Sequence, residues 1–151
     1  MRWSILVLLV ACSKSAPPSG EPAETAPRIK AGIAVTETTL SETTEYKVAL
    51  GVPETSTMFQ LTVTPKQGWK INPDYPSRLA VTPAAGCALS KPTQRGADAL
   101  QLDATRASWQ FDLATCAAGM QQLAGDMRFA VCTEKTCVEK KEKIAIALDV
   151  K

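Results

Sequence analysis

Apolar and polar residues alternate along several short stretches of this chain, and this alternation restricts its fold more than any other feature. In the segment MFQLTVTP, the side chains of Phe59, Leu61 and Val63 would share one face and the intervening polar residues the other. A period of two residues is typical of a strand with one buried and one solvated face. The same pattern recurs in three further segments, SWQFDLAT (108–115), MRFAV (127–131) and IAIALDV (144–150).

Weaker candidate strands lie between these segments, separated by turns rich in proline, glycine, asparagine and aspartate. No long stretch has a helical period. Together the segments predict an all-β chain, an immunoglobulin-like antiparallel β-sandwich of about seven to nine short strands, with a small barrel as the competing architecture. The weaker candidates are residues 32–39, 43–51, 78–83, 87–90 and 98–103.

The first residues, MRWSILVLLVAC, indicate export from the cytoplasm. Arg2 supplies a positive charge, and the apolar run at 5–10 is too short to span a bilayer, which needs about 20 residues. We therefore expect a signal segment, not a membrane anchor helix. Its end, LVAC (9–12), resembles a bacterial lipobox, and the resemblance implies cleavage before Cys12 and attachment of lipid to Cys12. The alternative is a secretory signal with a chance cysteine.

The sequence predicts three parts: a signal segment (1–11), a lipidated cysteine with a flexible tether (12–29), and a β-sandwich domain (30–151). The tether is rich in proline, alanine, serine and glutamate and has no periodicity. In proteobacterial lipoproteins, a residue such as Ser13 after the lipidated cysteine implies the outer membrane. We expect a periplasm-facing lipoprotein of the bacterial envelope, attached to the outer membrane by its lipid.

The composition excludes several kinds of chemistry. The chain has no histidine, which removes Ser-His-Asp and Cys-His catalysis and histidine metal ligation. A net charge of +2 implies no nucleic-acid partner. The spacing of the aspartates and glutamates does not support a hydrolase, and no cofactor is expected. Cysteines are the main residues left for covalent chemistry.

If Cys12 carries lipid, four of the five cysteines remain, which fits two disulfides in an oxidising compartment. In the segment VCTEKTCV, a four-residue loop would place Cys132 and Cys137 opposite each other in a hairpin, at a separation that a disulfide accepts. Such a bridge closes a very short loop, so it contributes little stability. Alternation puts Val131 on the core face and therefore Cys132 off it. An accessible, dispensable bridge suits thiol–disulfide exchange.

Cys87 and Cys116 remain as the other pair, and we expect them to form a structural disulfide across a longer loop. Other pairings, including Cys116 with one of the two hairpin cysteines, stay open at this point. A zinc site made of four cysteines is the metal alternative, but Cys87 and Cys116 lack the close spacing of a zinc knuckle. We expect no metal.

The order of these features resembles the amino-terminal periplasmic domain of DsbD-type thiol–disulfide interchange proteins, over residues 45–150. The resemblance rests on two segments, FQLTVTPKQGWKINPDYPSRLAVTP and ASWQFDLATCAAGMQQLAGDMRFAVCTEKTC. It implies an immunoglobulin-like sandwich whose paired cysteines, here Cys132 and Cys137, accept electrons from a thioredoxin-like partner and pass them on. It also implies that the loop containing Trp69, Asp74 and Tyr75 caps the cysteine pair. An alternative for Asp74 is that its side chain only fixes the turn.

Two functions from different classes follow. The first is a lipid-anchored protein that takes part in thiol–disulfide exchange through Cys132 and Cys137. The second is a non-enzymatic binding or assembly lipoprotein in which both disulfides are structural.

Overall fold

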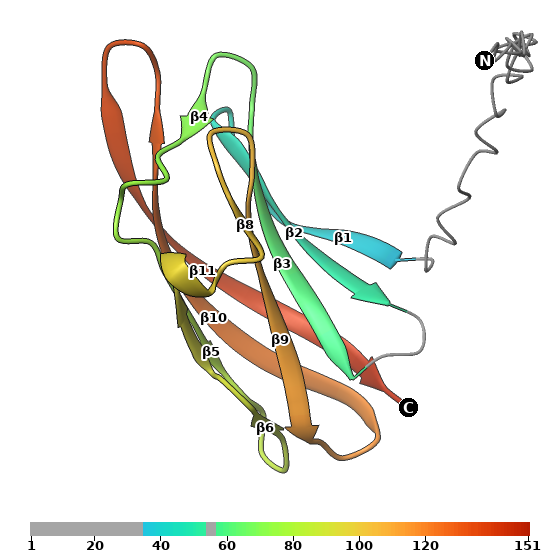
Figure 1. Cartoon of the computed structure of the whole chain (residues 1–151). Coiled ribbons are helices and arrows are strands. Elements are labelled where there is room, and N and C mark those ends of the chain that lie inside the picture. Colours follow the sequence, from blue (N-terminus) through green and yellow to red (C-terminus); the bar gives the residue numbers. More distant parts are fainter. Residues whose placement is uncertain (1–34, 54–56) are drawn as a thin grey trace, which may run out of the picture. The chain divides into compact units, whose positions relative to one another are not determined.

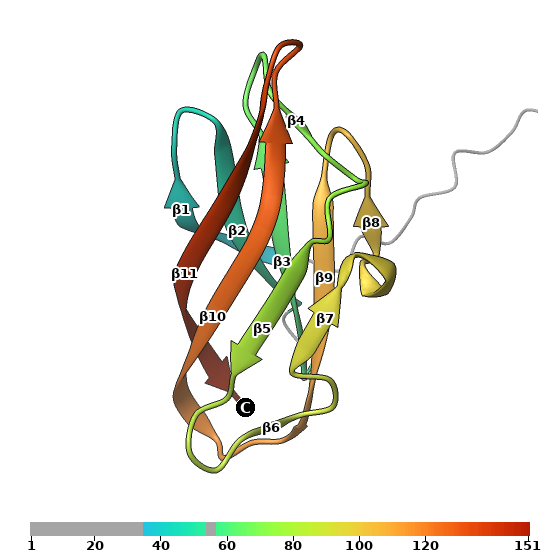
Figure 2. The same cartoon turned by 90° about the vertical axis from the view of Figure 1, so that its left-hand side faces the viewer.

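The computed structural model describes residues 35–53 and 57–151, which belong to one compact unit. These residues form eleven strands and one short 3-10 helix. The strands make two antiparallel sheets that face each other (Figures 1 and 2). The predicted all-β sandwich is confirmed, and an immunoglobulin-like arrangement is compatible with it. The expected signal segment and tether, residues 1–29, lie outside the described residues.

The first sheet has the strand order β1-β2-β3-β9-β6, and β8 also pairs with β9. The competing architecture, one sheet closed on itself, is wrong, because this sheet and the second remain separate. The strands of the first sheet are β1 (Val35–Glu42), β2 (Tyr46–Pro53), β3 (Met58–Pro65), β6 (Ala88–Leu89), β8 (Gln101–Leu102) and β9 (Ala107–Thr115).

The second sheet has the order β11-β10-β5-β7, and the short β4 also pairs with β10. A 3-10 helix at Gly96–Asp98 follows β7. The strands of this sheet are β4 (Lys70–Ile71), β5 (Arg78–Thr82), β7 (Thr93–Arg95), β10 (Gly119–Cys132) and β11 (Cys137–Val150).

The alternating residues form the core between the sheets, as the sequence predicts. Alternate side chains are buried in β3 from Phe59 to Val63, in β9 from Ala107 to Phe111 and in β10 from Leu123 to Val131, and the stacked rings of Phe59 and Phe111 lie 5.3 Å apart. Burial of these apolar side chains is the main favourable term in folding. The largest fully buried side chains include Trp109, Phe59, Phe111, Phe129, Leu61, Ile71, Leu79 and Met127.

Strands β10 and β11 are each 14 residues long, much longer than the alternating segments 127–131 and 144–150. The apolar alternation is interrupted at Gly125 in β10, beyond which Leu123 is buried again, and in β11 it gives way to Lys140 and Glu142. These two residues share the inner face of β11 with Ile144 and are half-buried. A pattern of apolar residues alone therefore finds only part of each strand.

The inward charges of β11 have partners in the first sheet. The Tyr46 hydroxyl donates a hydrogen bond to the Glu142 carboxylate, and Lys140 forms an ion pair with Glu45. The Tyr46 ring also meets Phe129 edge to face at 4.9 Å. A buried polar group is costly unless it is paired, so these contacts fix how the two sheets lie against each other.

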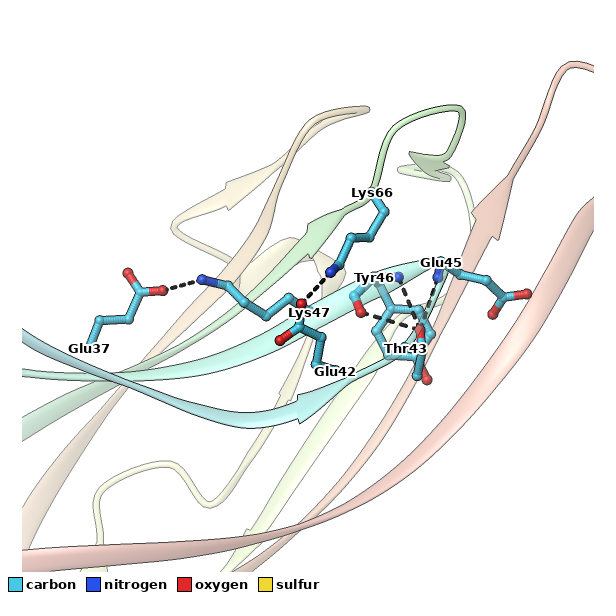
Figure 3. A network of polar contacts seen from close by, with 7 residues as sticks. All are labelled: Glu37, Glu42, Thr43, Glu45, Tyr46, Lys47 and Lys66. Carbon is cyan, nitrogen blue, oxygen red and sulfur yellow. Dashed lines mark hydrogen bonds and ion pairs between the residues drawn. The ribbon is translucent and has the colours of Figure 1, made fainter.

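A tight turn between β1 and β2 positions Tyr46 (Figure 3). The Thr43 Oγ1 atom accepts hydrogen bonds from the backbone N–H groups of Glu45 and Tyr46, both at 3.1 Å. Beside the turn, Lys66 of the loop after β3 pairs with Glu42, and Lys47 pairs with Glu37 at 2.7 Å (Figure 3). These exposed ion pairs contribute little, so the side-chain cap of Thr43 is the main local determinant of the turn.

We expect the free energy of unfolding to fall above about pH 10 because of Tyr46. Burial, and then the hydrogen bond to Glu142, raise the pKa of Tyr46 above its ordinary value of 10.0. A pKa raised on folding contributes stability that is complete below the ordinary pKa and is lost as pH rises toward the folded value. Urea unfolding between pH 7 and 11 should show this slope, and Tyr46→Phe should remove most of it at a cost of about 1–2 kcal/mol at pH 7.

Tyr75→Phe is the comparison variant: the pKa of the half-buried Tyr75 is also raised, but less than that of Tyr46, so this change should remove a smaller part of the slope. Equal alkaline slopes in the wild-type protein and Tyr46→Phe would contradict the assignment.

Candidate functional site

The candidate site is the tip of the hairpin formed by β10 and β11. The two strands pair residue by residue from Gly119 opposite Val150 to Cys132 opposite Cys137. Cys132 and Cys137 form a disulfide, and their Cα atoms are 4.0 Å apart. The opposition that the four-residue loop predicts is therefore present, and the bridge closes the last pair of a long ladder.

The loop between the two cysteines has hydrogen bonds of its own. The Thr133 N–H donates to the Thr136 carbonyl oxygen at 2.8 Å. The Thr133 Oγ1 atom accepts from the N–H groups of Lys135 and Thr136, both at 3.2 Å. The turn and the ladder therefore hold Cys132 opposite Cys137 without the help of the disulfide.

The two sulfur-bearing residues differ in exposure. Val131 is fully buried, and Cys132, the next residue, lies on the outer face and is half-buried. Cys137 is exposed. The prediction that Cys132 lies off the core face is confirmed, and Cys137 is the more exposed of the two residues.

A cavity of about 380 Å³ lies beside Cys132. Strand β4 forms one wall, because Lys70 pairs with Cys132 and Ile71 with Val131. Gly68, which has a φ of +84°, makes the turn that places Trp69 in the wall and against the core. The lining residues are Gly68, Trp69, Lys70, Cys132, Thr133, Glu134 and Lys135.

The segment that follows β4 crosses the outer face of β10. The Asn72 N–H donates to the Ala130 carbonyl oxygen at 2.9 Å. Ala130 lies on the same outer face as Cys132 yet is only 3% exposed. Desolvation and a hydrogen bond to Glu139 of β11 raise the pKa of Tyr75. The segment is thus hydrogen-bonded to β10 and β11, and it covers the outer face of β10 next to the disulfide.

The three residues expected in the cap have different positions. Trp69 lines the cavity with Cys132, and Tyr75 reaches Glu139. Asp74 is exposed, and its backbone N–H donates to the Asn72 Oδ1 atom at 3.1 Å. Asp74 is not among the residues that line the cavity, and its place supports the alternative in which it belongs only to the turn.

Cys87 and Cys116 form the second disulfide, 29 residues apart in the sequence. They flank the pairing of Ala88 with Thr115, where β6 meets β9. This end of the sandwich is opposite the hairpin tip (Figures 1 and 2). Both cysteines are half-buried. Of the pairings left open by the sequence, the structure has the one between these two cysteines.

The surroundings of the bridge are polar and of mixed charge. Lys70 and Lys135 line the cavity together with Glu134. Within residues 35–53 and 57–151, no three histidine, cysteine, aspartate or glutamate side chains are grouped so that they could hold a metal ion. The same residues contain no helix long and apolar enough to cross a membrane.

Sequence reasoning did not find Lys70, Ala130 or Glu139 as parts of the site. Lys70 lies in a strand of two residues, which is too short to show any period. The burial of Ala130 and the contact of Glu139 depend on Tyr75, which is far away in the sequence. The one local signal was the turn at Gly68, which directs Trp69 and Lys70 toward the tip.

The two disulfides should contribute unequally to stability. In the chain-entropy model, bridges with sequence separations of 5 and 29 differ by about 1.4 kcal/mol. Replacing Cys132 and Cys137 together by serine should therefore lower the free energy of unfolding by less than replacing Cys87 and Cys116 together. Urea unfolding of the two double variants measures the difference, and a larger loss from the hairpin variant would contradict it.

No family model and no curated protein matches this sequence. Among solved structures, the chain is similar to the GAE domain of GGA2p from Saccharomyces cerevisiae. That match has 9% identity and a TM-score of 0.37, and it covers 74% of this chain and 97% of the other.

Proposed function

We propose that this protein takes part in thiol–disulfide exchange through the Cys132–Cys137 bridge, as a lipid-anchored protein of the bacterial envelope. One observation carries the proposal: the hairpin around the bridge has its own ladder and turn hydrogen bonds. The ladder from Gly119–Val150 to Val131–Val138 and the hydrogen bonds of Thr133 do not depend on the sulfur–sulfur bond, so we expect them to remain when it breaks. A reduced pair would stay preorganised for closing again.

The exposures of the two cysteine residues support a direction of attack. A partner thiolate would attack the Sγ atom of Cys137, the more exposed of the two residues, and the electron pair of the broken bond would go to Cys132. A second partner thiolate would then attack the partner sulfur of this mixed disulfide and release Cys137. The partner dithiol would be oxidised to a disulfide, and the bridge reduced to two thiols.

The cavity beside Cys132 supports the same proposal. The leaving thiolate would form next to Lys70, whose backbone pairs with Cys132, and near Lys135. Ammonium groups favour a thiolate, whereas Glu134 opposes it. Trp69 and the hydrogen-bonded segment after β4 limit the approach to Cys132 from the cavity side. A thioredoxin-like protein, which presents a thiolate on a convex surface, is the expected partner.

Lipid attachment is the second part of the proposal and rests on the LVAC (9–12) segment. A lipid on Cys12 would hold the domain at the periplasmic face of the outer membrane through residues 12–29. The oxidising periplasm favours formation of both bridges.

Trapping with a defined partner tests the exchange. The probe is a purified thioredoxin whose resolving cysteine has been replaced, activated as an aromatic disulfide. Cys132→Ser leaves the exposed Cys137 thiol and should form the mixed disulfide about tenfold faster than Cys137→Ser, which leaves the half-buried Cys132. Mass spectrometry of the conjugates measures both rates. Equal rates would contradict attack at Cys137.

Reduction of the intact bridge separates exchange from a purely structural role. In redox buffers of glutathione or dithiothreitol, an exchanging bridge should have a reduction potential above about −300 mV, and a structural bridge a lower one. Cys87–Cys116, measured in the same protein, is the internal control. A potential for Cys132–Cys137 as low as that of a structural bridge would favour the binding or assembly lipoprotein instead.

Metabolic labelling tests the lipid. Cells fed radioactive palmitate should label the wild-type protein, and Cys12→Ser should lose the label and the membrane association. Ser13→Ala is the control and should keep both. Label that remains in Cys12→Ser would contradict lipidation at this cysteine.

A further inference from the structure

Strand β11 has an open edge that its own charges protect over only half of its length. It pairs with β10 on one side, and in Figure 2 it lies at the edge of its sheet. The part from Glu139 to Lys143 carries five charges in a row, which discourages pairing with another strand. The seven residues from Ile144 to Val150 carry one charge, that of Asp149. This second half is a strand edge with little protection.

The backbone of this second half is also accessible. Near Glu142 the end of β1 approaches β11, because the Ser41 hydroxyl donates to Glu142 Oε2 at 3.5 Å. Further along, a cavity of about 860 Å³ separates the two strands, with Thr36 and Thr38 on one side and Ala147–Lys151 on the other. The first sheet therefore does not cover the β11 edge from Ala147 onward.

We propose that this edge pairs antiparallel with the β11 edge of a second copy of the chain, centred on Ile146. In that register Lys143 of each copy faces Asp149 of the other, and Ala145 faces Ala147. These four residues share the exposed outer face of β11. Opposite charges directly across two strands attract, and small side chains between them allow close approach. The strand is therefore complementary to itself.

The inner face of the strand fits the same register. Ile144 faces Leu148, Ile146 faces its own copy, and all three are buried side chains that would continue the core of one sheet into the other. Moving the register by one residue in each chain, to a centre on Ala145, would place Glu142 opposite Leu148 on this face. The register centred on Ile146 avoids that mismatch.

Within the described chain, Lys143 and Asp149 are within ion-pairing distance of no opposite charge. Asp126 is the residue directly opposite Lys143 on β10. In the proposed pair, Lys141 would face Lys151, the last residue of the chain given, so the ends of the interface repel. The interface is short, and we expect a dimer that dissociates on dilution.

The pairing leaves both hairpin tips free and is independent of the redox proposal. The two β11 strands run in opposite directions from Ile146, and nine residues separate Ile146 from Cys137 in each. At about 3.3 Å per residue, the two tips would lie about 60 Å apart at opposite ends of one continuous sheet. A dimer of this kind would present two separate Cys132–Cys137 bridges.

Exchanging the charges of Lys143 and Asp149 tests the proposal. Sedimentation velocity over a range of concentrations is measured on the full chain carrying Cys12→Ser, which removes the lipid. Asp149→Lys or Lys143→Asp alone should weaken dimerisation about tenfold, because each creates two repulsive pairs. The two changes together should restore it to within about threefold of the unaltered interface. The altered side chains are exposed, and circular dichroism confirms the fold of each variant.

Lys135→Asp combined with Asp149→Lys is the matched control and should not restore the dimer, because the exposed Lys135 lies in the hairpin loop, outside the proposed interface. Three results would overturn the proposal. The protein could be a monomer at every concentration, the single substitutions could leave the dimer affinity unchanged, or the control variant could restore that affinity.

Discussion

The antiparallel ladder between β10 and β11 is the interaction on which the rest of this structure depends. Its fourteen residue pairs fix which side chains face inward along the whole length of the second sheet. The inner face of β10 supplies Met127, Phe129 and Val131 to the core, and its other edge pairs with β4 and β5. The same register sets Cys132 opposite Cys137 on the outer face, so core and candidate site follow from one pairing.

Much of this fold could be predicted from local sequence, because a strand with one buried face has a period that the chain itself displays. Phe59, Leu61 and Val63 were placed correctly for that reason, and the loop length was enough to set Cys132 opposite Cys137. Strand β4 could not be found, since two residues have no period. The inward position of Glu142 was also hidden, because its partner Tyr46 is 96 residues away. From sequence alone, a charged residue is predicted to face solvent unless such a partner is known.

The candidate site combines rigid support with an accessible bond. The segment after β4 is held by hydrogen bonds from the Ile71 N–H to the Ala104 carbonyl oxygen and from the Asn72 N–H to the Ala130 carbonyl oxygen. Trp69 is therefore a fixed wall of the cavity beside Cys132. Selectivity for one sulfur atom would come from this wall, since Cys137 is the more exposed of the two residues. Proteins commonly place reactive groups in loops that a rigid scaffold positions in this way.

The hydrogen-bonded turn at Thr133 has a consequence for how the two bridges form. The four cysteines of the β-sandwich domain can pair with one another in three ways, and a random search would sample all of them. A hairpin closes within microseconds, far faster than thiols oxidise. Once it has formed, Cys132 and Cys137 are each other's nearest thiols, and their oxidation leaves Cys87 with only Cys116. The short loop thus selects the correct connectivity of the whole domain, and a longer loop at this position would allow scrambled isomers to accumulate.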